Sequence, residues 1–135
     1  MSDARAVVEQ FFRAGVTSDR KGRADLFTED GVVEFPFAPA GMRARYQGRE
    51  AIEWLFTTLG RRADEANLKI DESGSTMTLH ETTDPEVVIA ELDLKLDADT
   101  RLPYIQVFHV TNGQISLFRD YWGPITADFT ASSLA

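Results

Sequence analysis

The stretch YIQVFHVTNGQISLFRDYW, residues 104–122, contains two apolar segments on either side of Asn112-Gly113. Both residues of a two-residue hairpin turn need positive φ, which Asn and Gly adopt at low cost. The stretch therefore predicts two antiparallel strands, at 104–110 and 115–122. In a strand, alternate side chains share a face, so Phe118, Asp120 and Trp122 are expected on one face of the second strand.

The rest of the chain extends this hairpin into a sheet with helices. Loose alternation at 67–79 and clean alternation at 87–96 predict two further strands, and 32–35 a short one. Upstream, apolar residues recur at helical spacing after Asp3 and predict a first helix. A second short helix is expected after Ser18, and a third at about 49–59. We expect a single α+β domain over 1–135, in which three N-terminal helices cover a curved, cone-shaped antiparallel sheet. The mouth of such a cone is where a small ligand would lie.

Composition excludes several classes of function. The chain has 135 residues, 14 Lys+Arg against 22 Asp+Glu, a net charge of −8, two histidines and no cysteine. Without cysteine there is no disulfide, thiolate nucleophile or Cys-based metal site. The acidic balance argues against nucleic acid or an anionic membrane as partner. The sequence shows no membrane-length apolar run and no signal peptide, so we expect a cytoplasmic protein that uses no metal or cofactor.

Carboxylates are the remaining candidates for chemistry. Burial between Phe118 and Trp122 would raise the pKa of Asp120 and suit it to acid–base catalysis, whereas a half-solvated face would leave it paired with a cation. In the run Glu91-Leu92-Asp93-Leu94-Lys95, either the leucines or the charged residues face the core, and periodicity does not decide between them.

Two further features stay open from the residues alone. In the strand at 104–110, either Tyr104, Gln106 and Phe108 or the alternate residues face inward. Arg43 and Arg45 lie in a loop before the third helix, where they could bind an anion near the mouth or simply be solvated.

Several motifs, in this order, resemble the SnoaL-like branch of the nuclear transport factor 2 superfamily. This branch includes SnoaL-type polyketide cyclases, ketosteroid isomerases, limonene-epoxide hydrolase and the phenazine-biosynthesis A/B proteins. The resemblance covers about residues 4–126, and its matching segments are Leu26-Phe27-Thr28-Glu29-Asp30-Gly31, Pro36, Gly48-Arg49-Glu50-Ala51-Ile52, Asn112-Gly113-Gln114-Ile115 and Arg119-Asp120-Tyr121-Trp122.

The resemblance implies catalytic roles for some residues, and at other positions this chain lacks the catalytic residue of its relatives. Asp120 matches the catalytic aspartate of limonene-epoxide hydrolase and the acid/base aspartate of the cyclases, and Asp93 matches a second carboxylate of the hydrolase. It also implies that Asp93 and Asp120 face into the cone, which would place the leucines outside, where members of the superfamily often dimerise. Phe35 stands where ketosteroid isomerases carry their catalytic aspartate, and Leu55 stands near the position of the phenazine proteins' pocket histidine.

These points together predict a small cofactor-free enzyme acting on an apolar small molecule by ring closure, double-bond isomerisation or epoxide opening. Asp120 is the predicted general acid/base, with Asp93 and Glu91 sharing its proton network. A homodimer through the outer sheet face is also expected. The alternative is a non-catalytic ligand-binding or dimerisation module with solvated carboxylates. The predicted substrate-binding residues are Phe11, Phe35, Trp54, Tyr104, Gln106, Phe118 and Trp122.

Overall fold

The computed structural model describes residues 3–96 and 100–122 of the chain. Two helices, two strands and a third helix make up its first half, and four strands follow one another in its second half. The elements are α1 (Asp3–Val16), α2 (Arg20–Asp25), β1 (Phe27–Glu34), β2 (Arg45–Gln47), α3 (Arg49–Glu65), β3 (Asp71–Glu81), β4 (Val87–Lys95), β5 (Arg101–Thr111) and β6 (Gln114–Trp122).

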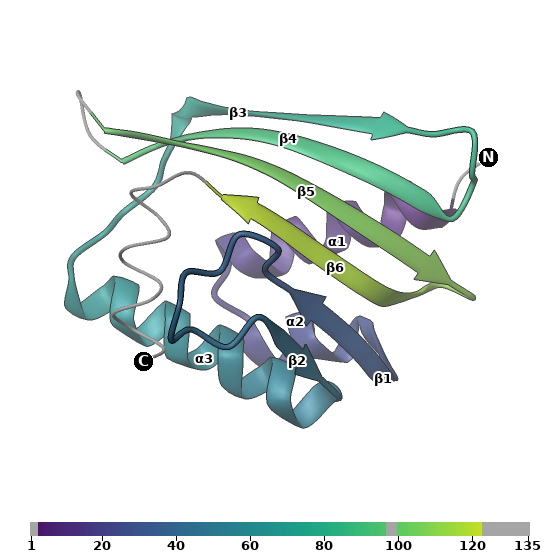
Figure 1. The fold of residues 1–135 in the computed structure, drawn as a ribbon. Coiled ribbons are helices and arrows are strands. Elements are labelled where there is room, and N and C mark those ends of the chain that lie inside the picture. Colours follow the sequence, from purple (N-terminus) through teal and green to yellow (C-terminus); the bar gives the residue numbers. More distant parts are fainter. Residues whose placement is uncertain (1–2, 97–99, 123–135) are drawn as a thin grey trace.

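The strands form one six-stranded sheet in the order β2-β1-β6-β5-β4-β3. The sheet is curved, and the helices lie on one side of it (Figure 1). This confirms the α+β fold, but the sheet is mixed, because β1 pairs with β6 in parallel while the other neighbours are antiparallel. The face of the sheet toward the helices is called the inner face below, and the opposite one the outer face.

Local signals explain most element boundaries. Asn112 and Gly113 have φ of 52° and 78°, as the predicted hairpin turn between β5 and β6 requires. The second helix is capped by the side chain of Asp19, which accepts from the Gly22 N–H, and not by Ser18 as expected. The predicted cap at Asp3 depends on a side chain outside the described part of the chain. The first strand begins earlier than predicted, at Phe27, and the short strand β2 beside it was not predicted.

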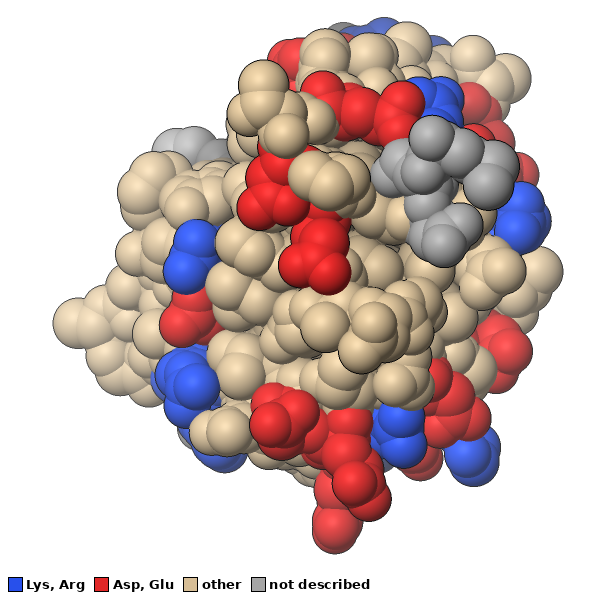
Figure 2. Space-filling view, turned by 90° about the vertical axis from the view of Figure 1, so that its right-hand side faces the viewer, with Lys and Arg blue, Asp and Glu red and all other residues tan. Residues whose placement is uncertain are grey.

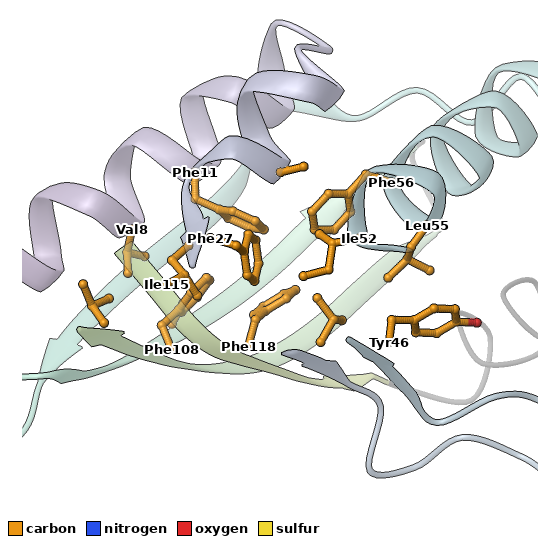
Figure 3. Packing of buried hydrophobic residues seen from close by; sticks show 14 of the residues in the cluster. Val8, Phe11, Phe27, Tyr46, Ile52, Leu55, Phe56, Phe108, Ile115 and Phe118 are labelled. Atoms are coloured by element: carbon orange, nitrogen blue, oxygen red, sulfur yellow. The ribbon is translucent and has the colours of Figure 1, made fainter. Parts of the chain in front are cut away.

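The core lies between the helices and the inner face, and aromatic rings dominate it (Figure 3). Phe11 of α1 is fully buried, and its ring meets those of Phe27, Phe56, Phe108 and Phe118 at centroid distances of 5.1–6.2 Å. Such edge-on and tilted pairs add to the free energy gained by burying apolar surface. The aromatic cluster fixes where α1 and α3 sit on the sheet.

The surface charge and the lengths of the apolar helices bear on the predicted absence of nucleic-acid and membrane partners. Figure 2 views the side that faces right in Figure 1, and acidic side chains are spread over it, as a net charge of −8 leads one to expect. Within 3–96 and 100–122, no helix combines the length and apolar character needed to span a bilayer.

Candidate active site

Register across the last strands brings polar side chains together on the inner face. Gln106 lies opposite Asp120, and Tyr104 lies opposite Trp122. Gln106 and Trp122 are 8% and 6% exposed, and the buried Phe108 and Phe118 continue the same face. The inward register of Tyr104, Gln106 and Phe108, left open by the sequence, is thereby resolved. The predicted shared face of Phe118, Asp120 and Trp122 is confirmed.

Asp120 carries its carboxyl group into this apolar surrounding. The residue as a whole is partly exposed, but its Oδ1 is buried and has no hydrogen-bond partner. Loss of water around the charged form raises the pKa of Asp120 to about 7, and hydrogen bonding from Gln106 and the charge of Arg23 act in the opposite direction. A carboxyl group with this pKa exists in both protonation states near neutral pH.

The Arg23 guanidinium is a further charged group of the site, and the sequence did not point to it. Arg23 belongs to the short helix α2, and its guanidinium carbon lies 3.8 Å from the centroid of the Phe11 ring and 5.1 Å from that of Phe56. Its Nε is buried and has no hydrogen-bond partner. Burial lowers the pKa of Arg23 to about 10, and the nearby Asp120 partly offsets this effect. The side chain is therefore still a cation at neutral pH.

The position of the Arg23 guanidinium depends on a glycine of the neighbouring helix. A Cβ at Gly15 of α1 would lie 3.0 Å from the Arg23 guanidinium carbon, so the missing side chain leaves room for this group. The arginines to which the sequence pointed, Arg43 and Arg45, are exposed, and Arg45 pairs with Glu34 at 3.7 Å.

Four buried polar atoms around Asp120 have no hydrogen-bond partner: Arg23 Nε, Gln106 Oε1, Asp120 Oδ1 and Trp122 Nε1. We call these four residues the inner polar group. Unpartnered buried polar atoms are costly and rare in folded proteins, and they concentrate where a ligand or water completes the bonding. Two of the four atoms are donors and two are acceptors, counting the ionised form of Asp120.

The predicted proton network of three carboxylates is wrong. Glu91 and Asp93 lie on the outer face, because they are opposite Ile105 and Pro103, whereas Leu92 is 8% exposed on the inner face. Burying the leucine side of β4 releases more apolar surface from water than burying the charged side would, and so decides the register.

Each charged residue of this outer row has its own partner instead. Glu91 Oε1 lies 2.6 Å from His80 Nε2, and Asp93 Oδ2 accepts from Arg101 at 3.0 Å. The ammonium group of Lys95 lies 3.5 Å from Asp71. None of these contacts involves the inner polar group, so Asp120 is separated by the sheet from both of its predicted partners.

The Phe and Trp residues that were predicted to bind substrate divide into three groups. Phe35, Phe118 and Trp122 are buried near Asp120, and the Phe35 and Trp122 rings stack at 4.4 Å. Phe11 lies in the centre of the core. Trp54 does not line the inner side as expected, because it is 53% exposed and stacks on Tyr46.

A shallow hollow of about 600 Å³ lies along the outer face, and its lining also includes Leu92, Tyr104 and Trp122 of the inner face. Outer-face residues form much of its lining, and the exposed Phe37 also borders it, with its ring against Tyr121 at a centroid distance of 5.4 Å. Among the residues that the structure describes, no three His, Asp or Glu side chains are grouped as metal ligands.

Comparison with known proteins gives consistent matches over most of the chain. The model of the SnoaL-like domain matches residues 8–118. An uncharacterised PhzA/B-like protein of Pseudomonas aeruginosa is 32% identical over 132 residues, which cover 91% of this chain and 86% of that protein.

Two solved structures extend the comparison. A putative isomerase from Bacillus subtilis superimposes with a TM-score of 0.78 at 27% identity, over 98% of this chain and 96% of that one. SalBIII, described as an epoxide hydrolase/cyclase-like enzyme in pyran ring formation in the polyether salinomycin, superimposes with a TM-score of 0.65 at 22% identity. That match covers 90% of this chain and 92% of that one, and it shows a shared fold.

Proposed function

The chain belongs to the SnoaL-like family, and from this membership we propose a cofactor-free enzyme that moves a proton on an apolar small molecule. Asp120 is the proposed general acid and base. The observation that carries the proposal is the enclosed Asp120 carboxyl group, whose pKa of about 7 matches the working range of acid–base catalysis at neutral pH.

The surrounding residues support such a role. As a carboxylate, Asp120 can accept a proton from a C–H or O–H group, and in its neutral form it can return the proton to a developing oxygen anion. The half-buried cation of Arg23, whose charge acts on Asp120, can stabilise negative charge that develops on the substrate. Gln106, directly opposite on β5, holds the carboxyl group in position. Phe35, Phe118 and Trp122 provide apolar surface for the substrate.

Ring closure, double-bond isomerisation and epoxide opening each take a proton from one atom and give a proton to another, and a carboxyl group that titrates near neutral pH can do both. Two structural neighbours are a putative isomerase and an epoxide hydrolase/cyclase-like enzyme, which supports these three reaction classes for this chain. Because Glu91 and Asp93 lie on the outer face, the proposal assigns the proton transfer to Asp120 without them.

The homodimer and the cytoplasmic location stay predictions. The leucines expected at a dimer interface face inward, so an interface on the outer sheet face would use other apolar residues. Ile105 and Phe37 are candidates, since they are 41% and 63% exposed.

A general-base probe tests the catalytic proposal without knowledge of the natural substrate. In 5-nitrobenzisoxazole, a base removes the ring C–H proton, the released electron pair forms a nitrile, and the N–O bond breaks to give a coloured phenolate. We expect turnover to rise with pH in a single step centred near 7. Asp120→Asn should reduce the rate at pH 8 by roughly 100-fold.

Asp93→Asn is the matched control, since it makes the same change on the outer face. It should leave the rate within about twofold, because it removes only a surface ion pair with Arg101. Equal rates for wild type and Asp120→Asn, together with an ordinary aspartate titration for Asp120, would contradict the enzyme and favour the non-catalytic ligand-binding module.

A further inference from the structure

We infer that the inner polar group binds its substrate through a carboxylate or another anionic oxygen, with Arg23 as the counter-charge. The inference rests on the proposed function and adds to it the chemical class of the substrate. It gives Arg23 and Trp122 the role of anion-binding residues beside the acid/base Asp120.

Arg23 is the first part of the argument. Arg23 is half-buried: its guanidinium lies over the faces of Phe11 and Phe56, and its Nε is buried and unpartnered. Cation–π contacts with two rings compensate only part of the cost of desolvating a cation. A guanidinium also presents its N–H groups in a planar fork that fits two carboxylate oxygens. A bound anion would give Nε the hydrogen-bond acceptor that the protein does not provide, and it would add opposite charge when Asp120 is neutral.

Trp122 provides an independent second donor. It is 6% exposed, and its indole N–H has no acceptor although the ring is held by stacking on Phe35. An indole N–H only donates, so its missing partner must be an acceptor. Trp122 is two residues from Asp120 on the same face of β6, a separation of roughly 7 Å along the strand.

The apolar surroundings define the rest of the ligand. Phe35, Phe118 and Leu92 are buried on the same side and provide no charge. The buried acceptor Gln106 Oε1 can take a hydrogen bond from a hydroxyl or amine of the same molecule. The expected ligand is thus an apolar, ring-containing body with an acidic group at one end.

Asp120 makes this binding dependent on pH. The titratable groups around it on the inner side, within the described chain, are Arg23 of α2, Tyr46 of β2 and Tyr104 of β5. Below about pH 7, Asp120 is neutral and the charge of Arg23 is available to an anion. Above it, the Asp120 carboxylate neutralises Arg23 and repels the ligand. An anion should therefore bind best in slightly acid solution.

The test measures binding of matched probes by NMR titration. The probes are 2-naphthoate with 2-naphthamide, and 4-phenylbutanoate with its primary amide. At pH 6 we expect at least one carboxylate to bind about tenfold more tightly than its amide. Its affinity should fall by up to about 30-fold between pH 6 and 8.5, because proton loss from Asp120 competes with it. The indole N–H signal of the buried Trp122 should shift on binding, while that of the exposed Trp54 stays in place.

Three variants separate the contributions of Arg23 and Asp120 to binding. Arg23→Met should abolish the preference for the carboxylate, and Arg23→Lys should retain part of it; circular dichroism checks that both fold. Asp120→Asn should bind the carboxylate at pH 8.5 within about twofold of its affinity at pH 6. The inference is overturned if no carboxylate binds more tightly than its amide, or if the preference persists in Arg23→Met. Because binding is measured without turnover, an inactive enzyme that still binds carboxylates refutes only the catalytic proposal.

Discussion

The guanidinium carbon of Arg23 lies 3.8 Å from the centroid of the Phe11 ring, which places a half-buried cation against the aromatic core. The two residues come from the adjacent helices α2 and α1. The negative face of the ring attracts the cation, and the nearby Asp120 is the charge that responds to it. Burial has the largest effect on the protonation of Asp120, and part of the opposing effect comes from a residue almost a hundred positions away in the sequence.

Replacing Arg23 should change the titration of Asp120. In Arg23→Met the apolar surroundings remain while the positive charge is lost, so the pKa of Asp120 should rise above about 7. Carboxyl ¹³C NMR across pH 5–9 measures this directly. Arg119→Met is the control, because Arg119 is adjacent to Asp120 but lies on the outer face, where its Nε donates to Glu34 Oε1 at 2.8 Å. Equal shifts in both variants would mean that Arg23 has no specific role.

Asp120 should also make the free energy of unfolding depend on pH. Its pKa is about 7 in the folded protein and near 3.8 in the unfolded chain, so between these values only the folded state holds the proton. The free energy of unfolding contributed by this group must then decrease as pH rises through the window. Between pH 5 and 8 the wild type should lose roughly 3 kcal/mol relative to Asp120→Asn.

Urea denaturation of both proteins at each pH measures this difference. Asp93→Asn, compared with the wild type in the same way, should show almost no such trend, because its partner is the exposed Arg101. A constant difference between wild type and Asp120→Asn from pH 5 to 8 would contradict the raised pKa of Asp120.

The sequence predicted the fold and half of the site, for identifiable reasons. Asn112-Gly113 and the alternation after it fixed the hairpin, and the same alternation placed Asp120 with Phe118 and Trp122. Alternation sorts side chains into two faces but does not say which face is buried, so Glu91 and Asp93 were assigned to the wrong side. The resemblance to the epoxide hydrolase favoured that assignment, whereas burial of the leucines opposed it.

Arg23 could not be predicted because its environment is entirely tertiary. Its position in a six-residue polar helix is typical of a solvated side chain. Only the packing of α2 near Gly15 and over the rings of Phe11 and Phe56 encloses it. Contacts between residues of different helices leave no periodic pattern in a single sequence.

The stacked pair Phe35 and Trp122 should contribute strongly to stability. Phe35 is 2% exposed and its ring stacks on Trp122 at 4.4 Å, so Phe35→Ala leaves a cavity and should cost roughly 3–5 kcal/mol in urea denaturation. Phe37→Ala removes the same side chain from a site that is 63% exposed, and should cost under about 1 kcal/mol. Similar losses for the two variants would show that Phe35 is not packed as described.

Gly15 should be a positioning residue for Arg23. A Cβ at this site would lie 3.0 Å from both Arg23 Cζ and Nη2, so Gly15→Ala should shift the guanidinium by a few tenths of an ångström. A shift away from Asp120 weakens the attraction between the two charges and should raise the pKa of that carboxyl group, as Arg23→Met does, but by much less. Carboxyl ¹³C NMR of the single and double variants provides the measurement, and in the Arg23→Met background the alanine should have no further effect on Asp120.

Stability gives the same double-mutant cycle a second readout. Alanine is favoured over glycine within a helix by up to about 1 kcal/mol, and near the end of α1 the gain should be smaller. In the wild-type background the displaced guanidinium offsets this gain, whereas in Arg23→Met nothing opposes it. The alanine should therefore stabilise the methionine variant more than the wild type, and a coupling of zero would mean that Gly15 and Arg23 do not interact.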